Sequence, residues 1–80
     1  MSGEEFDEYS GVFVAQTDKA ILFVPENNVR WSGTKASWDD ASAIWLPKSR
    51  ISYDDSREYS RGETITVDIP DWIAEEKGLI

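Results

Sequence analysis

The stretch Glu63–Ile69, with the sequence ETITVDI, decides the fold of this chain. Its residues alternate between an apolar and a polar set, with Ile65, Val67 and Ile69 against Thr64, Thr66 and Asp68. A period of two places one set on each face of a β-strand. The segment therefore predicts a strand with one buried face, which further strands must help to cover.

Upstream of this stretch, several short apolar runs predict those further strands. The runs Gly11–Gln16 and Ala20–Val24 are separated by the polar triplet Thr17–Lys19, a pattern typical of a β-hairpin. Ala43–Leu46 is a third clear strand, which Pro47 ends or interrupts with a bulge. Segments 29–31 and 50–53 are compatible with shorter strands.

Downstream, Pro70 and Asp71 suit the first turn of a helix, because proline fixes φ and an acid complements the helix dipole. The helix is predicted over Asp71–Lys77, with Gly78 as its C-terminal cap. The predicted fold is mainly β: a small antiparallel β-barrel or bent sheet of four to five strands with a short C-terminal α-helix. We expect the core to contain Val12, Val14, Ile21, Phe23, Ile44, Leu46, Ile65, Val67, Trp72 and Ile73.

The length of 80 residues predicts a single small domain, residues 1–80. The chain has no Cys and no His, which excludes disulfides, Cys/His zinc sites and imidazole catalysis. We therefore expect no enzyme activity, no catalytic residues and no cofactor. The acidic pairs Asp39-Asp40 and Asp54-Asp55 lack the alternating ligand spacing of a calcium loop, so we interpret them as solvated turns, with no metal site.

No apolar run approaches the roughly 18 residues of a membrane-spanning helix, and the N-terminus lacks the features of a signal peptide. We expect a soluble, cytoplasmic protein that does not bind membranes. Whether it is a monomer or a homodimer stays open.

Charge is distributed unevenly along the chain. The 16 acidic and 8 basic residues give a net charge of -8. Residues 19–67 are balanced, so the whole imbalance lies in the two ends. If the ends lie close together, as chain ends often do, they form one acidic surface that attracts basic proteins and repels nucleic acid. The alternative is charge that serves solubility alone. The candidate binding residues are Glu4, Glu5, Asp7, Glu8, Asp71, Glu75 and Glu76.

The first ten residues are acidic and polar, and we interpret 1–10 as either a flexible acidic arm or an edge segment. A second candidate surface is the stretch Glu26–Ala41, where Trp31 and Trp38 stand among Asn, Ser, Gly and Asp. A short strand can bury one face, so we predict that at least one of these tryptophans is exposed and available to a partner.

The middle of the chain also suggests an alternative function. Trp31, Trp38 and Lys48 combine aromatic rings with a positive charge, as single-strand nucleic-acid binders do. The alternative is therefore a small OB-like accessory module that binds single-stranded nucleic acid. The neutral middle and the acidic whole lack the basic surface that a phosphate binder usually shows, so nucleic acid is the less favoured partner.

Two motifs, W-L-P-K-S at Trp45–Ser49 and I-P-D-W-I-A-E-E-K-G-L at Ile69–Leu79, together with the hairpin GVFVAQTDKAILF, resemble a family of small proteins encoded by phages and prophages. The resemblance covers roughly half of the chain and implies an origin and a fold type, not an activity. The chain departs from the family pattern at residues 26–42, which form a longer link than the family implies.

Small acidic phage proteins of this kind resemble DNA mimics, including anti-CRISPR proteins that occupy the basic nucleic-acid channel of a host effector. The leading hypothesis is therefore a phage-derived, non-catalytic binding protein that inhibits a host protein with a basic surface. Its carboxylates would take the place of phosphates against Lys and Arg of that partner.

Overall fold

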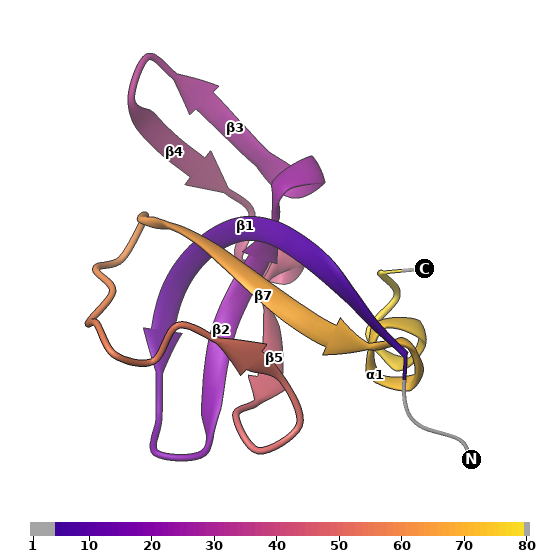
Figure 1. The fold of residues 1–80 in the computed structure, drawn as a ribbon. Coiled ribbons are helices and arrows are strands. Elements are labelled where there is room, and N and C mark those ends of the chain that lie inside the picture. Colours follow the sequence, from indigo (N-terminus) through magenta and orange to yellow (C-terminus); the bar gives the residue numbers. More distant parts are fainter. Residues whose placement is uncertain (1–4, 80) are drawn as a thin grey trace.

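A computed structural model describes residues 5–79, which form a five-stranded antiparallel sheet, a separate two-stranded sheet and one short C-terminal helix (Figure 1). The predicted mainly β class is confirmed, in its bent-sheet form. The elements are β1 (Phe6–Gln16), β2 (Ala20–Pro25), β3 (Val29–Ser32), β4 (Lys35–Trp38), β5 (Ile44–Pro47), β6 (Ser52–Tyr53), β7 (Thr64–Pro70) and α1 (Asp71–Glu76), with 3-10 turns at Glu26–Asn28 and Asp40–Ser42.

The strand order β5-β2-β1-β7-β6 makes β1 the centre of the large sheet. β1 and β2 form the predicted hairpin, and β1 also pairs with β7 from Phe6 opposite Pro70 to Val12 opposite Thr64. The first and last strands are therefore neighbours. The sequence allowed two interpretations of residues 1–10, a flexible arm or an edge segment. Phe6–Ser10 form an edge segment, because they pair with β7.

The sheet is strongly curled, because the connection between its two edge strands is too short to span a flat sheet. β5 and β6 lie at opposite edges of the sheet, yet only residues 48–51 connect them. Four strand spacings in a flat sheet would measure about 19 Å. Five extended peptide steps reach about 17 Å, and this connection also contains a turn in which Arg50 N donates to Pro47 O at 3.0 Å. The two edges must therefore curve toward each other. Within residues 5–79 they do not pair, so the barrel stays open.

The core fills the inner face of this curled sheet. It consists of Phe13, Ile21, Phe23, Leu46, Ile51, Ile65, Val67, Ile69, Ile73 and Ala74. The prediction that Glu63–Ile69 forms a strand with one buried face is confirmed, because Ile65, Val67 and Ile69 are buried. Of the ten predicted core residues, eight are buried and Ile44 packs half-buried at the margin.

The prediction that Trp72 belongs to the core is wrong, since 49% of this residue is exposed. Helix α1 has six residues and buries the face that holds Ile73 and Ala74. Each residue turns a helix by about 100°, so the residue before Ile73 points away from that face. The predicted cap is confirmed: Gly78 has φ 79°, Leu79 N donates to Ala74 O at 2.7 Å, and the Leu79 side chain packs against the core.

Gly11 permits the closest contact between β1 and β2. A Cβ atom on this residue would lie 2.2 Å from the carbonyl oxygen of Val24 and 2.6 Å from the ring of Phe23. Real Cβ atoms do not approach other atoms so closely, so a side chain here would force the strands apart.

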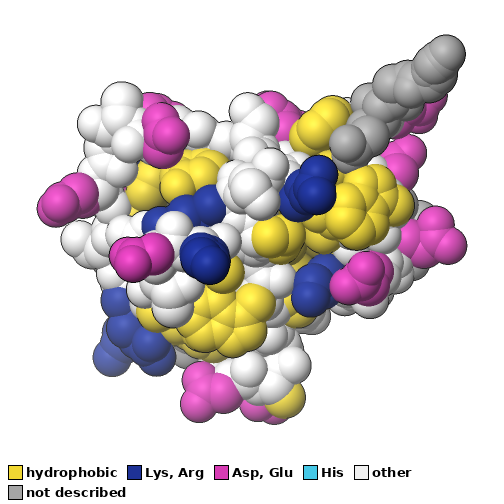
Figure 2. Space-filling model, turned by 90° about the horizontal axis from the view of Figure 1, so that it is seen from below, with side chains coloured by type: hydrophobic (Ala, Val, Ile, Leu, Met, Phe, Trp, Pro, Cys, Tyr) yellow, Lys and Arg dark blue, Asp and Glu magenta, His cyan; other side chains and the backbone are white. Residues whose placement is uncertain are grey.

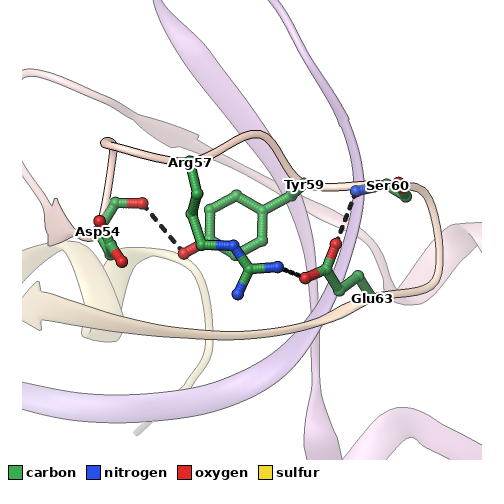
Figure 3. Close-up of polar contacts among 5 residues, drawn as sticks. All are labelled: Asp54, Arg57, Tyr59, Ser60 and Glu63. Atoms are coloured by element: carbon green, nitrogen blue, oxygen red, sulfur yellow. Dashed lines mark hydrogen bonds and ion pairs between the residues drawn. The ribbon is translucent and has the colours of Figure 1, made fainter.

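The long loop between β6 and β7 is held by its own polar contacts (Figure 3). The Tyr59 hydroxyl donates to Asp54 O at 3.0 Å, and the Tyr59 ring stacks on Phe13 of β1 at 5.7 Å. The Arg57 guanidinium lies 4.5 Å from the centroid of this ring and forms an ion pair with Glu63, whose carboxylate also accepts from Ser60 N. These contacts attach the loop to the sheet.

Candidate functional site

The pairing of β1 with β7 brings the acids of both chain ends together. Asp71 N donates to Glu5 O at 2.9 Å, and Glu8 lies directly opposite Asp68. Helix α1, which carries the remaining acids, follows β7 without a break. We call the set Glu5, Asp7, Glu8, Asp68, Asp71, Glu75 and Glu76 the acidic end. Glu4, a further predicted member, lies outside the described residues.

The proximity of these carboxylates changes their chemistry. The pKa of Asp71 is raised, first by a hydrogen bond in which its protonated form donates to Asp7, then by desolvation and by the charges of Asp7, Glu5 and Glu75. Burial, and then the charges of Asp7 and Asp71, also raise the pKa of Tyr9. Neighbouring carboxylates contribute to both shifts, because Asp7 lies close to Asp71 and to Tyr9.

Two aromatic side chains accompany the acids. Phe6 and Trp72 are each 49% exposed, and Trp72 lines a shallow hollow of about 380 Å³ together with Glu75 and Glu76. Figure 2 shows acidic side chains beside a hydrophobic patch at the right-hand end of the molecule, the end that holds α1 in Figure 1. The acidic end therefore combines charge with exposed apolar surface, which is the usual composition of a protein-binding surface.

The second candidate surface is the β3–β4 hairpin, which projects from the sheet (Figure 1). Val29 pairs with Trp38 and Trp31 pairs with Ala36, so the two tryptophans share one face of the hairpin. Trp31 is 48% exposed, which confirms the prediction that at least one of the pair is exposed. Trp38 is half-buried, and Arg61 lies over its ring at 5.2 Å.

The third residue of the nucleic-acid alternative lies elsewhere. Lys48 lies directly after β5, where its N donates to Lys19 O at 2.8 Å beside the β1–β2 turn. In Figure 1 this turn lies at the bottom of the molecule and the β3–β4 hairpin at the top. Its Nζ donates to the side-chain oxygen of Gln16 at 2.8 Å. The fold therefore does not bring Lys48 together with Trp31 and Trp38.

The acidic turns act as local caps. Asp39 Oδ1 accepts from Ala41 N at 3.0 Å, and Asp54 Oδ1 accepts from Ser56 N at 3.1 Å. The bonds from Ser56 lower the pKa of Asp54. Across residues 5–79, no group of three or more acidic side chains is arranged to hold a metal ion. Over the same residues, no helix has the length and apolar character needed to cross a bilayer.

Comparisons of this chain with models of protein families, with curated proteins and with solved structures each returned no match. The geometry of the acidic end and of the hairpin is therefore the basis on which a function has to be argued.

Proposed function

We propose that this chain is a non-catalytic binding protein that inhibits a host protein through the acidic end, by presenting carboxylates to a surface that otherwise binds nucleic-acid phosphates. The observation that carries the proposal is the convergence of acids from β1, β7 and α1, with Asp71 N bonded to Glu5 O and Glu8 opposite Asp68. Charges that are far apart in the sequence thereby act as one surface.

The physical argument rests on collective charge. A single exposed ion pair contributes at most about 1 kcal/mol. Several carboxylates within a Debye length of about 8 Å act together, and they raise both the association rate and the selectivity for a basic partner. Carboxylates also form charge-assisted hydrogen bonds with arginine, as phosphates do.

The proposed phage origin and host target rest on the resemblance of the sequence motifs to those of phage-encoded proteins. A small acidic protein of phage origin would serve as a counter-defence factor, of the anti-CRISPR kind or a similar one, in the cytoplasm of the host cell. The alternative as a binder of single-stranded nucleic acid has less support, since Trp31, Trp38 and Lys48 do not form one surface.

A pull-down from host-cell lysate with mass spectrometry tests the proposal. The test variant changes Glu5, Asp7 and Glu8 to Lys. The matched control changes Asp18, Asp55 and Glu58, exposed acids outside the acidic end, to Lys, so both variants have the same net charge. We expect the control to retain the partner that the unaltered chain captures, and the test variant to lose it.

Two further results bear on the same proposal. Duplex DNA should displace the captured partner, because both would occupy one basic surface. Thermal unfolding of the two variants should differ little, since exposed charges contribute little to folding. Retention of the same partner by the test variant, with unchanged salt dependence, would show that the acidity serves solubility alone.

A further inference from the structure

The outer half of β1 is paired on one side only. β7 pairs with β1 from Phe6 to Val12, whereas β2 begins to pair with it at Gly11. Among residues 5–79, Phe6–Ser10 therefore pair with a strand on one side only, while the turn Glu26–Asn28, which follows β2, contacts β1 on the other side at the Ser10 end. We call this unpaired side of Phe6–Ser10 the open edge.

The hydrogen bonds around β1 identify which main-chain groups face the open edge. Glu5 O accepts from Asp71 N, and Phe13 exchanges bonds with Glu63 O and Gly62 N, all on the β7 side. Because bonding direction alternates along an antiparallel strand, the odd-numbered residues from 5 to 13 face β7. The N–H and C=O groups of Phe6 and Glu8 therefore point to the open edge, at a spacing that matches an added strand, whereas the register with β2, continued by one residue, places Ser10 opposite Glu26.

The side chains along the open edge define the strand that could be added. Phe6 and Glu8 lie on one face of the sheet, with Asp68 beside Glu8, and Asp7 lies on the other face. All four are at least partly exposed. An added strand would thus meet carboxylates on both faces and one aromatic ring.

This charge also determines what the edge excludes. A second copy of the chain, added edge to edge, would bring Asp7 and Glu8 against the same acids, and opposed like charges destabilise strand pairing. Charged residues on an edge strand are a known protection against self-association. An extended segment with a basic residue at every second position would instead place its positive charges on one face of the sheet, beside Glu8 and Asp68.

We propose that the open edge accepts an extended, lysine- or arginine-rich segment of the partner protein, which adds to β1 as a sixth strand of the large sheet. This inference rests on the proposed function and specifies its partner: the basic surface includes a strand-forming segment, held by main-chain hydrogen bonds as well as by charge. The main-chain hydrogen bonds would keep part of the binding free energy at high salt, whereas salt would screen a purely electrostatic attraction.

The test uses the full chain and a synthetic eight-residue peptide of alternating Lys and Val, compared with the same peptide N-methylated at the amides of one edge. Both peptides have the same charge, but the methylated one cannot donate hydrogen bonds from that edge. We expect the methylated peptide to bind about tenfold more weakly, because two or three hydrogen bonds are lost. Amide exchange should slow at Phe6 and Glu8 when the unmodified peptide binds.

Two variants of one residue separate main chain from charge in the protein itself. Glu8→Gln removes the charge and keeps the N–H group, whereas Glu8→Pro removes both. We expect Glu8→Pro to weaken binding of the unmodified peptide about tenfold beyond Glu8→Gln. The methylated peptide tests the same point with the unaltered chain, so the result does not depend on the folding of Glu8→Pro.

Several outcomes would overturn the open edge as the binding site. They are equal affinity of the two peptides, no binding of either, protection at Ile44–Pro47 instead of Phe6 and Glu8, and protection of the Phe6 and Glu8 amides by the chain alone, which would indicate a second copy. None of these outcomes decides the proposed function, which fails independently if the Glu5, Asp7 and Glu8 charge reversal leaves capture of the lysate partner unchanged.

Discussion

The two halves of β1 belong to one strand but differ in their surroundings. Gly11–Val14 are buried, and Gly11 and Val12 pair with β2 on one side and β7 on the other. Phe6–Ser10 are largely exposed and pair with β7 alone. The inner half consists of Gly, Val and Phe, whereas the outer half carries Asp7 and Glu8. The difference indicates that the inner half holds the fold together, while the outer half extends from it and presents charge.

The largest expected effect is that of Gly11→Ala, at the start of the inner half. The new Cβ would meet the Val24 carbonyl and the Phe23 ring, so the strands must separate. We expect a loss of about 3 kcal/mol or more in the free energy of unfolding, at the upper end of the cost of overpacking. Urea titration measures it, with Ser10→Ala as the control, expected within about 0.5 kcal/mol of the unaltered chain. Equal midpoints for the two variants would contradict the close contact.

A pair of phenylalanines compares the two halves directly. Phe13 is 4% exposed and stacks on Tyr59, whereas Phe6 is 49% exposed. We expect Phe13→Ala to cost about 3–5 kcal/mol of stability. Phe6→Ala should cost less than about 1 kcal/mol and should instead weaken binding of the alternating Lys/Val peptide. Equal losses of stability in chemical denaturation would mean that the outer half also supports the core.

The smallest expected effect is on the pH dependence of stability. The pKa of Asp71 is raised from its ordinary value of 3.8, so the folded chain holds this proton more tightly than the unfolded chain. Its contribution to stability is present at low pH and is lost as the pH rises through the raised pKa. Asp71→Asn should remove this decline, as followed by urea midpoints across a pH series.

Asp54→Asn provides a control of opposite sign. The pKa of Asp54 is lowered, so its contribution is present above 3.8 and is lost as the pH falls through the lowered pKa. This variant should reduce the loss of stability in acid and leave the Asp71 decline in place. If Asp71→Asn left the decline with rising pH in place, the raised pKa of Asp71 would not be its cause.

The inner half and its neighbours could be predicted from sequence because their signals are local. The alternation in Glu63–Ile69, the hairpin of β1 with β2, and the Gly78 cap each depend on a few adjacent residues. The strand at Phe6–Ser10 and β4 at Lys35–Trp38 were not predicted as strands. Both are polar segments that become extended because a partner strand lies beside them, which is a nonlocal cause.

The candidate site was predictable in part for the same reason. Charge counting indicated that the two ends carry the acidity, and the contact of Glu5 with Asp71 shows that they meet. The open edge could not be inferred, because it depends on where β2 stops pairing with β1. Trp72 was wrongly placed in the core, since composition does not tell which side of a six-residue helix faces the sheet.

The pairing of β1 with β7 also has a consequence for the order of folding. Phe6 and Pro70 are neighbours in the sheet but lie almost a full chain length apart in sequence. Closing so long a loop has a high entropic cost, and folds dominated by such contacts form slowly, over milliseconds to seconds. The β1–β2 hairpin can form while β7 is still unstructured, so the outer half of β1 joins the sheet late. The acidic end thus requires the pairing of β1 with β7, and a basic partner would recognise the folded chain.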